Sequence, residues 1–290
     1  MEKVFRPSPS RNTALWGLGL SALVTFPMFF LLLSASSGPI FFLIPMTALF
    51  TLPSTLMVYV TLSGVKMRYE LGESRLKVKF GFSGVKIPYA AIENISLSRL
   101  TLLLRLIGGS WPGLYWGLFQ AKEVNRVRVY STKATGPFVL ISLVNGDKVA
   151  LSPEQPEDFI EAINIHRGSF GQMKTGDLGM LGTPRKALYI QVITVSIAYL
   201  AFLGYILWIY PSLPEVIPVH FGLNWKPDRW GHKSEIFAVA GIAAIFPILN
   251  AFLTLKFGRY DRTLSTILSI IFTLVTVMFF AIVSGMVTLV

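Results

Sequence analysis

The sequence predicts an α-helical membrane protein with five transmembrane helices and one inserted β-rich domain. Of its 290 residues, 53% are hydrophobic and only 14% are charged, whereas a soluble domain carries about 25% charged residues. A span needs roughly 20 mostly apolar residues. Five stretches meet this need without any Asp, Glu, Lys, Arg or His: residues 14–33, 40–62, 187–210, 236–255 and 264–290.

The distribution of charge predicts the orientation in the membrane. The net charge is +11, yet loop 211–235 holds three basic and three acidic residues and loop 34–39 holds none. Five spans place every other basic segment on one side, which the positive-inside rule makes cytoplasmic. We therefore expect a multi-pass protein of the cell membrane with a cytoplasmic N-terminus, an outer C-terminus and an outward loop 211–235. The basic excess then reflects topology and attraction to the lipid bilayer, not nucleic-acid binding.

The spans divide the chain into five parts. Residues 1–62 hold an N-terminal cytoplasmic segment and helices 1 and 2, and residues 63–170 form a cytoplasmic β-rich domain. A linker, 171–186, leads to a membrane domain, 187–256, with helices 3 and 4 around loop 211–235. Residues 257–290 are a basic cytoplasmic loop and helix 5. The chain has no cysteine, which excludes disulfides, thiol catalysis and cysteine-ligated metals.

Alternating patterns indicate strands in residues 63–170. Around residues 75–82 and 126–130, apolar and basic side chains alternate, which predicts half-buried strands with solvated basic faces. The apolar faces hold Leu76, Val78, Phe80, Phe82, Val127 and Val129; the basic faces hold Arg75, Lys77, Lys79, Arg126 and Arg128. Asn145-Gly146 predicts a hairpin turn. A helix is expected to start at Ser152 and to run through Phe159 and Ile163.

Two runs in this region resemble the bacterial PH-like (pleckstrin-homology-like) domain family. They are GGSWPGLYWGLF, residues 108–119, and ALSPEQPEDFIEAI, residues 150–163. The resemblance implies antiparallel strands closed by one C-terminal helix, with no assigned catalytic residue.

The apolar segment 100–119 has two further interpretations. A sixth span there would place the basic loops outside, and one Arg, one Pro and several Gly interrupt it. We therefore expect a long strand–loop–strand. Trp and Tyr favour the membrane–water interface, so Trp111, Tyr115 and Trp116 are predicted to rest on the membrane surface.

Loop 211–235 carries the pattern LPxxIPxHF followed by PDxWxxK. This pattern between two spans resembles a membrane domain of uncharacterised activity that is found in SdpI-type bacteriocin-immunity proteins. The matching residues are Leu213, Pro214, Ile217, Pro218, His220, Phe221, Pro227, Asp228, Trp230 and Lys233.

Several kinds of site are open for this loop. His220, Asp228 and His232 are metal-compatible ligands, and His220 with Asp228 or Glu215 would make an acid–base pair. A plainer interpretation is a rigid cap that Trp225 and Trp230 anchor at the interface. In that cap, Asp228 pairs with Arg229 or Lys233, or caps the next helix. A binding cap would present His220, Asp228, Trp230 and Lys233.

The function we expect is non-enzymatic: a sensor, an immunity-type protein or a membrane-organising module, with no cofactor. Its outward loop would bind an extracellular peptide or protein. A transporter or facilitator is the first alternative. A metal-dependent membrane enzyme that uses His220, Asp228 and His232 is the second.

Overall fold

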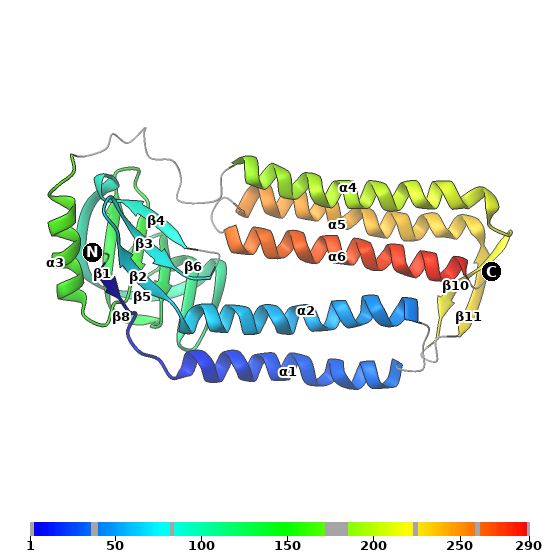
Figure 1. The fold of residues 1–290 in the computed structure, drawn as a ribbon, viewed down its shortest axis with the longest axis horizontal. Coiled ribbons are helices and arrows are strands. Elements are labelled where there is room, and N and C mark those ends of the chain that lie inside the picture. Colours follow the sequence, from blue (N-terminus) through cyan, green and yellow to red (C-terminus); the bar gives the residue numbers. More distant parts are fainter. Residues whose placement is uncertain are drawn as a thin grey trace. The chain divides into compact units, whose positions relative to one another are not determined.

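The computed structural model describes residues 3–35, 40–81, 84–171, 185–222, 226–258 and 262–288. The chain forms two compact units, which are described separately (Figure 1). The β-rich unit comprises Met1–Leu20, Met57–Thr183 and Arg259–Leu264. The helical unit comprises Ser21–Leu56, Pro184–Gly258 and Ser265–Val290.

A four-stranded antiparallel sheet opens the β-rich unit. Its strands, in spatial order, are β1 (Lys3–Phe5), β2 (Arg68–Leu71), β3 (Arg75–Lys79) and β4 (Val85–Pro88). The predicted alternation is confirmed, because Leu76, Val78 and Phe80 are at most 2% exposed. Phe82 lies outside the described residues. The pairing of β1 with β2 was not predicted, since it joins segments that are far apart in the sequence.

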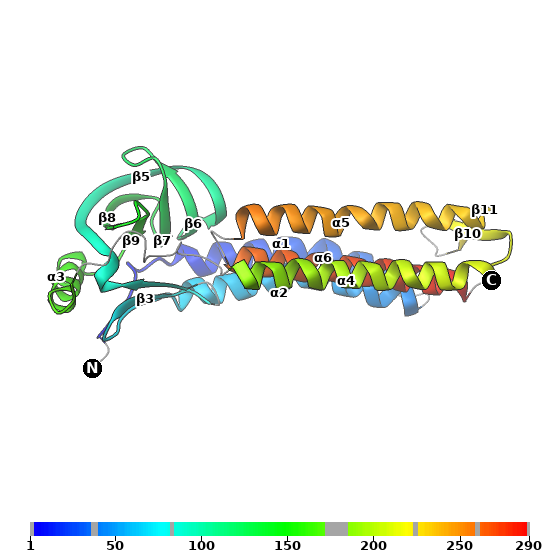
Figure 2. The same ribbon diagram turned by 90° about the horizontal axis from the view of Figure 1, so that it is seen from above.

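The other strands close into a barrel of order β5-β6-β7-β9-β8. Figure 2 shows β5 bending over the other barrel strands. After a short 3-10 helix, η1 (Tyr89–Ala91), the strands are β5 (Ile92–Trp111), β6 (Leu114–Ala121), β7 (Val127–Ser131), β8 (Thr135–Leu143) and β9 (Lys148–Leu151). Segment 100–119 is therefore a β-hairpin. The predicted turn joins β8 to β9, with a positive φ of 83° at Gly146.

Strand β7 corrects one prediction. Val127 and Val129 are fully buried as expected, but Arg128 on the opposite face is only 9% exposed. The strand lies between β6 and β9, and its outer face belongs to the core shared with the four-stranded sheet, which includes Tyr130. The prediction of a solvated basic face is therefore wrong for Arg128.

Helix α3 (Pro156–Arg167) closes the unit, and it starts later than the predicted Ser152. Ser152 ends the barrel instead: its hydroxyl lies 2.9 Å from the Ser131 hydroxyl and accepts the Thr132 amide N–H. Phe159 and Ile163 are fully buried on the inner face of the helix.

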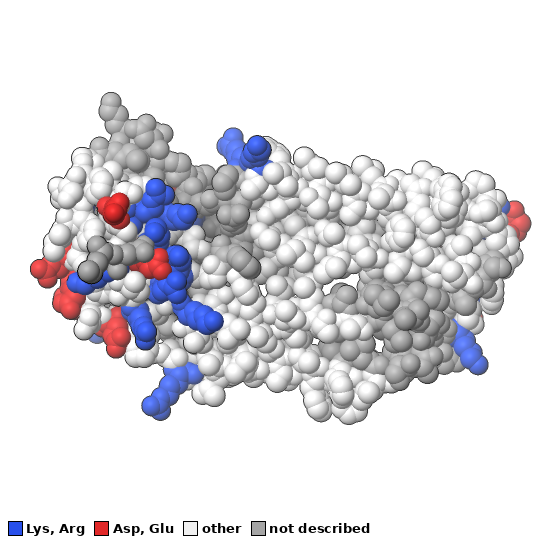
Figure 3. Space-filling model, in the orientation of Figure 1, with Lys and Arg blue, Asp and Glu red and all other residues white. Residues whose placement is uncertain are grey.

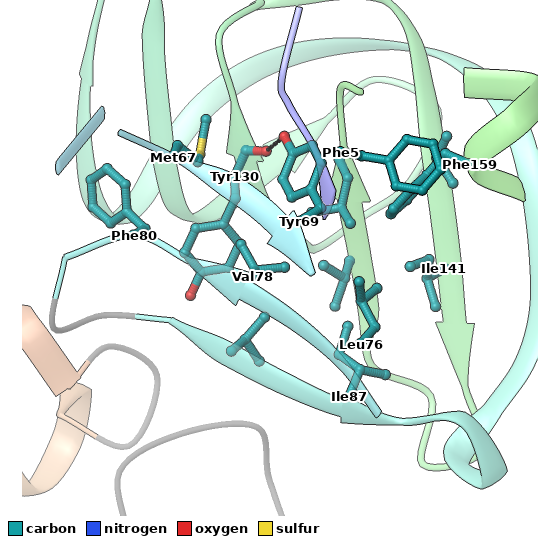
Figure 4. Close-up of a cluster of buried hydrophobic side chains, with 14 of the residues drawn as sticks. Phe5, Met67, Tyr69, Leu76, Val78, Phe80, Ile87, Tyr130, Ile141 and Phe159 are labelled. Atoms are coloured by element: carbon teal, nitrogen blue, oxygen red, sulfur yellow. Dashed lines mark hydrogen bonds between the residues drawn. The ribbon is translucent and has the colours of Figure 1, made fainter. Parts of the chain in front are cut away.

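The main core lies between the four-stranded sheet, the barrel and α3 (Figure 4). The Phe159 ring meets Phe5 edge-on at 5.0 Å and Tyr69 at 5.6 Å. The buried Tyr69 hydroxyl donates to the Tyr130 carbonyl at 2.8 Å and accepts from the Ser152 amide. Burial raises the pKa of Tyr69, so the hydroxyl keeps its proton and serves as a donor.

Helices α1 (Asn12–Ala35) and α2 (Ile40–Val65) contribute to both units. In the β-rich unit, the Thr13 hydroxyl donates to the Gly113 carbonyl of the β5–β6 turn. A side chain at Gly17 would collide with Thr61, so the start of α1 and the end of α2 are in close contact. In the helical unit, Thr25 donates to Ser54 at 2.7 Å.

The helical unit also holds α4 (Arg185–Ile209), α5 (Ile236–Phe257) and α6 (Arg262–Val287). Three helical stretches among the described residues are long and apolar enough to span a membrane: Arg185–Ser212, Lys233–Phe257 and Ser265–Val287. The described apolar parts of α1 and α2, Asn12–Phe26 and Ser54–Val65, are shorter. The structure thus confirms three of the five predicted spans as candidates.

A polar contact joins two of these helices. Asn250 of α5 is fully buried, and its Oδ1 atom accepts hydrogen bonds from Thr254 at 3.2 Å and from Ser269 of α6 at 3.1 Å. This hydrogen bond links α5 to α6 at a buried position.

Candidate recognition site on the β10–β11 hairpin

The loop between α4 and α5 is an antiparallel hairpin of β10 (Val216–Phe221) and β11 (Pro227–His232). Short 3-10 helices, η3 (Tyr210–Ser212) and η4 (Lys233–Glu235), connect it to the helices. Its inner side packs on the helix ends through Leu213 and Ile217, which join Ile236 of α5 and Met286 of α6 in one core. The hairpin is therefore fixed to the end of the helical unit.

The first polar pair crosses the hairpin near its tip. His220 Nδ1 lies 2.6 Å from Asp228 Oδ1, and the side chains are 66% and 50% exposed. In the strand register His220 is paired with Arg229, the neighbour of Asp228, and the register is irregular on either side of His220. Of the partners predicted for Asp228, the structure selects His220 and not Arg229 or Lys233.

The second cluster lies at the base of the hairpin. Glu215 accepts from His232 Nε2 and from Lys233 Nζ, both at 2.9 Å. His232 Nδ1 accepts the Ser234 amide N–H and so caps η4, which leaves Nε2 to carry the ring proton in the neutral form. The hydrogen bond and charge of Lys233, followed by those of His232, lower the pKa of Glu215.

A fourth ion pair completes the cross-linking. Arg229 of β11 bonds Glu235 of η4 at 2.9 Å. Lys233 is only 18% exposed in its side chain, and its ammonium lies 5.4 Å from the Tyr210 ring centroid. Lys233 therefore has structural contacts on two sides. The three acidic residues of the loop are all paired, so the ion pairs cross-link the two strands and the segments that join them to the helices.

The exposed surface of the hairpin is amphipathic. Trp230 is 53% exposed and Val216 54% exposed, and Trp230 stands opposite Pro218 in the strand register. His220 and Asp228 lie on the same hairpin. Trp225, predicted to anchor the cap, lies outside the described residues.

The predicted metal ligands do not converge. His220 pairs with Asp228 near the tip, whereas His232 pairs with Glu215 at the base. Within the described ranges, no group of three or more His, Cys, Asp or Glu side chains has the arrangement of a metal site. The strand register separates the two histidines, and it corrects the hypothesis of a joint site with His232.

The aromatic residues of the β5–β6 hairpin have packing roles in the β-rich unit. Trp111 is 9% exposed, and its indole N–H donates to the Thr13 carbonyl at 3.3 Å. Its ring meets Trp116 at 5.3 Å, and Trp116 meets Phe80 at 5.4 Å. Tyr115 is half-buried beside Phe119. Their contact with a membrane surface stays a prediction.

Two segments of the chain match known families. Residues 67–167 match the bacterial PH domain family. The match agrees with the sheet, the barrel and the closing helix α3. Residues 197–244, from α4 through the hairpin into α5, match a domain of unknown function, DUF1648. The structure thus supports a protein with a PH-like domain and candidate membrane helices.

One curated relative is an uncharacterised protein of Archaeoglobus fulgidus. It is 35% identical over 63 residues, which are 20% of this chain and 34% of that protein. The chain therefore matches about a third of that relative's length. No solved structure matches the chain.

The sequence pattern identified the exposed groups of the hairpin and the pairing of His220 with Asp228, but not the other ion pairs. Glu215 pairs with His232 and Lys233 and not with His220, and Glu235 pairs with Arg229. Their roles follow from the strand register, which places His232 opposite Val216, next to Glu215. The apolar run 216–221 was the signal available in the sequence, and Pro218 within it obscured the strand.

Proposed function

We propose that the protein is a non-enzymatic membrane module with five spans. Its outward hairpin recognises an extracellular peptide or protein, and its PH-like domain lies in the cytoplasm. A sensor or immunity-type role fits this arrangement. One observation carries the proposal: the hairpin presents Trp230 and the His220–Asp228 pair on a surface that three sets of ion pairs hold in shape.

The cross-linked and packed hairpin suits the recognition of a partner. A surface that is ordered before binding loses little conformational entropy when a partner docks. An exposed tryptophan is the residue type most enriched among binding hot spots. Trp230 would supply the apolar anchor, and His220 with Asp228 would supply a donor and an acceptor for the polar groups of a peptide.

The test of recognition compares two exposed tryptophans of the helical unit. Trp230 is 53% and Trp208 of α4 is 78% exposed. In cells that depend on the protein, Trp230→Ala combined with His220→Ala is expected to reproduce the deletion phenotype at an unchanged membrane level. Trp208→Ala is expected to behave as wild type. The proposal fails if the hairpin variant retains full function.

The topology can be tested directly because the chain has no cysteine. A single cysteine at Lys226 in the hairpin loop is expected to react with a membrane-impermeant maleimide on intact cells. A cysteine at Glu161, which is exposed on α3, should react only after permeabilisation. Labelling of both sites from the same side would refute the five-span arrangement.

A second candidate function rests on a different observation. The Ser234 hydroxyl lies 2.8 Å from His232 Nδ1, and His232 Nε2 lies 2.9 Å from Glu215. Nucleophile, base and carboxylate in this order would suit a hydrolase. Against it, Nδ1 also accepts the Ser234 amide, and Lys233 shares Glu215. Labelling by a fluorophosphonate that Ser234→Ala abolishes would favour this candidate over recognition.

A further inference from the structure

A cationic cleft lies in the β-rich unit where α1 begins and α2 ends. Its volume is about 660 Å³, within the range of small-ligand sites. The segment before α1, the last turn of α2 and the start of β2 form its walls. Its charged lining residues are Arg6, Lys66, Arg68 and Glu154.

The lining of this cleft carries more basic than acidic side chains. Arg68 bonds Glu70 at 2.6 Å. Arg6 and Lys66 are exposed, and no acidic side chain of the described chain lies within ion-pair distance of either. Glu154 is the single acidic residue in the lining. The first turn of α1 also lacks an acidic residue, so the partial positive charge of that helix N-terminus adds to the cationic character.

Apolar surface begins beside these cations. Val65 lines the cleft and is 57% exposed, and Leu15 and Trp16 in the first turns of α1 are 69% and 50% exposed. A free inorganic anion would gain nothing from contact with this apolar surface. A phospholipid needs both features, because its phosphate carries the charge while its acyl chains continue from it.

We propose that this cleft binds the headgroup of an anionic phospholipid. Arg6 and Lys66 contact the phosphate, and the acyl chains lie along the exposed apolar start of α1 and end of α2. The inference rests on the proposed membrane placement of these two helices. Arg6 and Lys66 precede residues 67–167, so both proposed phosphate ligands lie outside the stretch that matches the PH family, whereas Arg68 and Glu154 of the lining lie inside it.

The neighbouring sheet face supports an anionic partner. Figure 3 shows Lys and Arg gathered on the β-rich unit. On the outer face of the sheet, Arg68 stands directly opposite Lys79, and Glu70 forms ion pairs with both. Lys86 stands on the same face, opposite Lys77. A face with this excess of basic side chains is attracted to an anionic lipid surface.

The test compares two double variants with the same change of charge. Arg6→Gln/Lys66→Gln removes the two proposed phosphate ligands of the cleft, whereas Lys122→Gln/Arg126→Gln removes an exposed Lys and Arg of the same unit that lie outside both the cleft and the four-stranded sheet. The full chain, in an uncharged detergent, is titrated with short-chain phosphatidylglycerol or phosphatidylcholine. Bound lipid is counted by native mass spectrometry. Circular dichroism checks that each variant is folded.

Wild type is expected to bind phosphatidylglycerol about tenfold more tightly than phosphatidylcholine. The cleft variant should lose roughly thirtyfold in affinity for phosphatidylglycerol, the equivalent of two cations at a lipid surface, and the control variant less than about threefold. If the double variant does not fold, Lys66→Gln alone should lose about fivefold.

Three results would overturn the inference: equal binding of both lipids, an equal loss in the control variant, or displacement of the lipid by inorganic phosphate at the same concentration. The last result would indicate a small-anion site. Extraction of the chain from membranes by alkaline carbonate would instead refute the proposed function. A chain that resists extraction but shows no lipid preference refutes only this inference.

Discussion

Replacement of Phe159 by alanine tests the packing that unites the β-rich unit. Phe159 projects from α3 and is fully buried. Its ring contacts Phe5 of β1 at 5.0 Å and Tyr69 of β2 at 5.6 Å. Three segments that are distant in the sequence therefore meet at one side chain (Figure 4).

The expected loss follows from burial and contacts. Truncation of a fully buried phenylalanine costs about 3–5 kcal/mol, and the loss of two aromatic contacts favours the upper part of that range. Domains of this size have a free energy of unfolding of about 5–15 kcal/mol. With a urea dependence of about 2 kcal/mol per molar, the midpoint of unfolding should fall by about 2 M.

The assay is urea unfolding of the full chain in mild detergent, followed by tryptophan fluorescence. Trp111 and Trp116 report on this unit, because both pack in or against the same core. Ile165→Ala is the control: Ile165 lies on the same helix but is 67% exposed, and its replacement should change stability by at most about 0.5 kcal/mol. A midpoint shift under about 0.5 M for Phe159→Ala, or equal shifts for both variants, would refute the packing described.

Three further outcomes are expected. Gly108→Ala should prevent folding of the barrel, because φ at this residue is +104° and the new Cβ would collide with the opposite strand. Gly136→Ala is the control: φ is +117° but no atom lies near the new Cβ, so this variant measures the cost of the backbone conformation alone. Glu215 has a lowered pKa, so its ion pair with Lys233 is present above the ordinary carboxyl pKa of about 4.3 and is lost as the pH falls below that value. Amide hydrogen exchange of the hairpin should therefore become faster at acidic pH. Glu215→Gln should show this faster exchange already at neutral pH. Asn250→Ala should lower the stability of the helical unit by about 1 kcal/mol in thermal unfolding.

Local sequence patterns were sufficient to predict those parts of the fold that depend only on residues close together in the chain. Leu76 and Val78 alternate with lysines, and one face of β3 is buried as that pattern requires. Asn145-Gly146 forms its turn because glycine accepts a positive φ. These features need no knowledge of distant partners.

Other features depend on contacts between distant segments. Phe5 became a core residue only because β1 pairs with β2. Arg128 follows a half-buried pattern, yet a second layer covers its face. On the hairpin, the candidate groups were identified from residue type, but the separation of His220 from His232 depends on the strand register, which pairs His232 with Val216 and His220 with Arg229.

The ion pairs of the hairpin also relate its surface to the helices that carry it. Glu215 follows α4, whereas His232 and Lys233 precede α5, so the cluster at the base fastens the end of one helix to the start of the next. Asn250 then joins α5 to Ser269 of α6. The helices α4, α5 and α6 carry no ionisable side chain between their terminal turns other than tyrosine. A partner that separated His232 or Lys233 from Glu215 would therefore alter the spacing between α4 and α5 at the hairpin. This change would not require any charge to move along the helices. Binding at the hairpin would affect the rest of the protein only under one condition. The free-energy difference between the free and the altered spacing of α4 and α5 must be no larger than the difference in the partner's binding free energy for the two states.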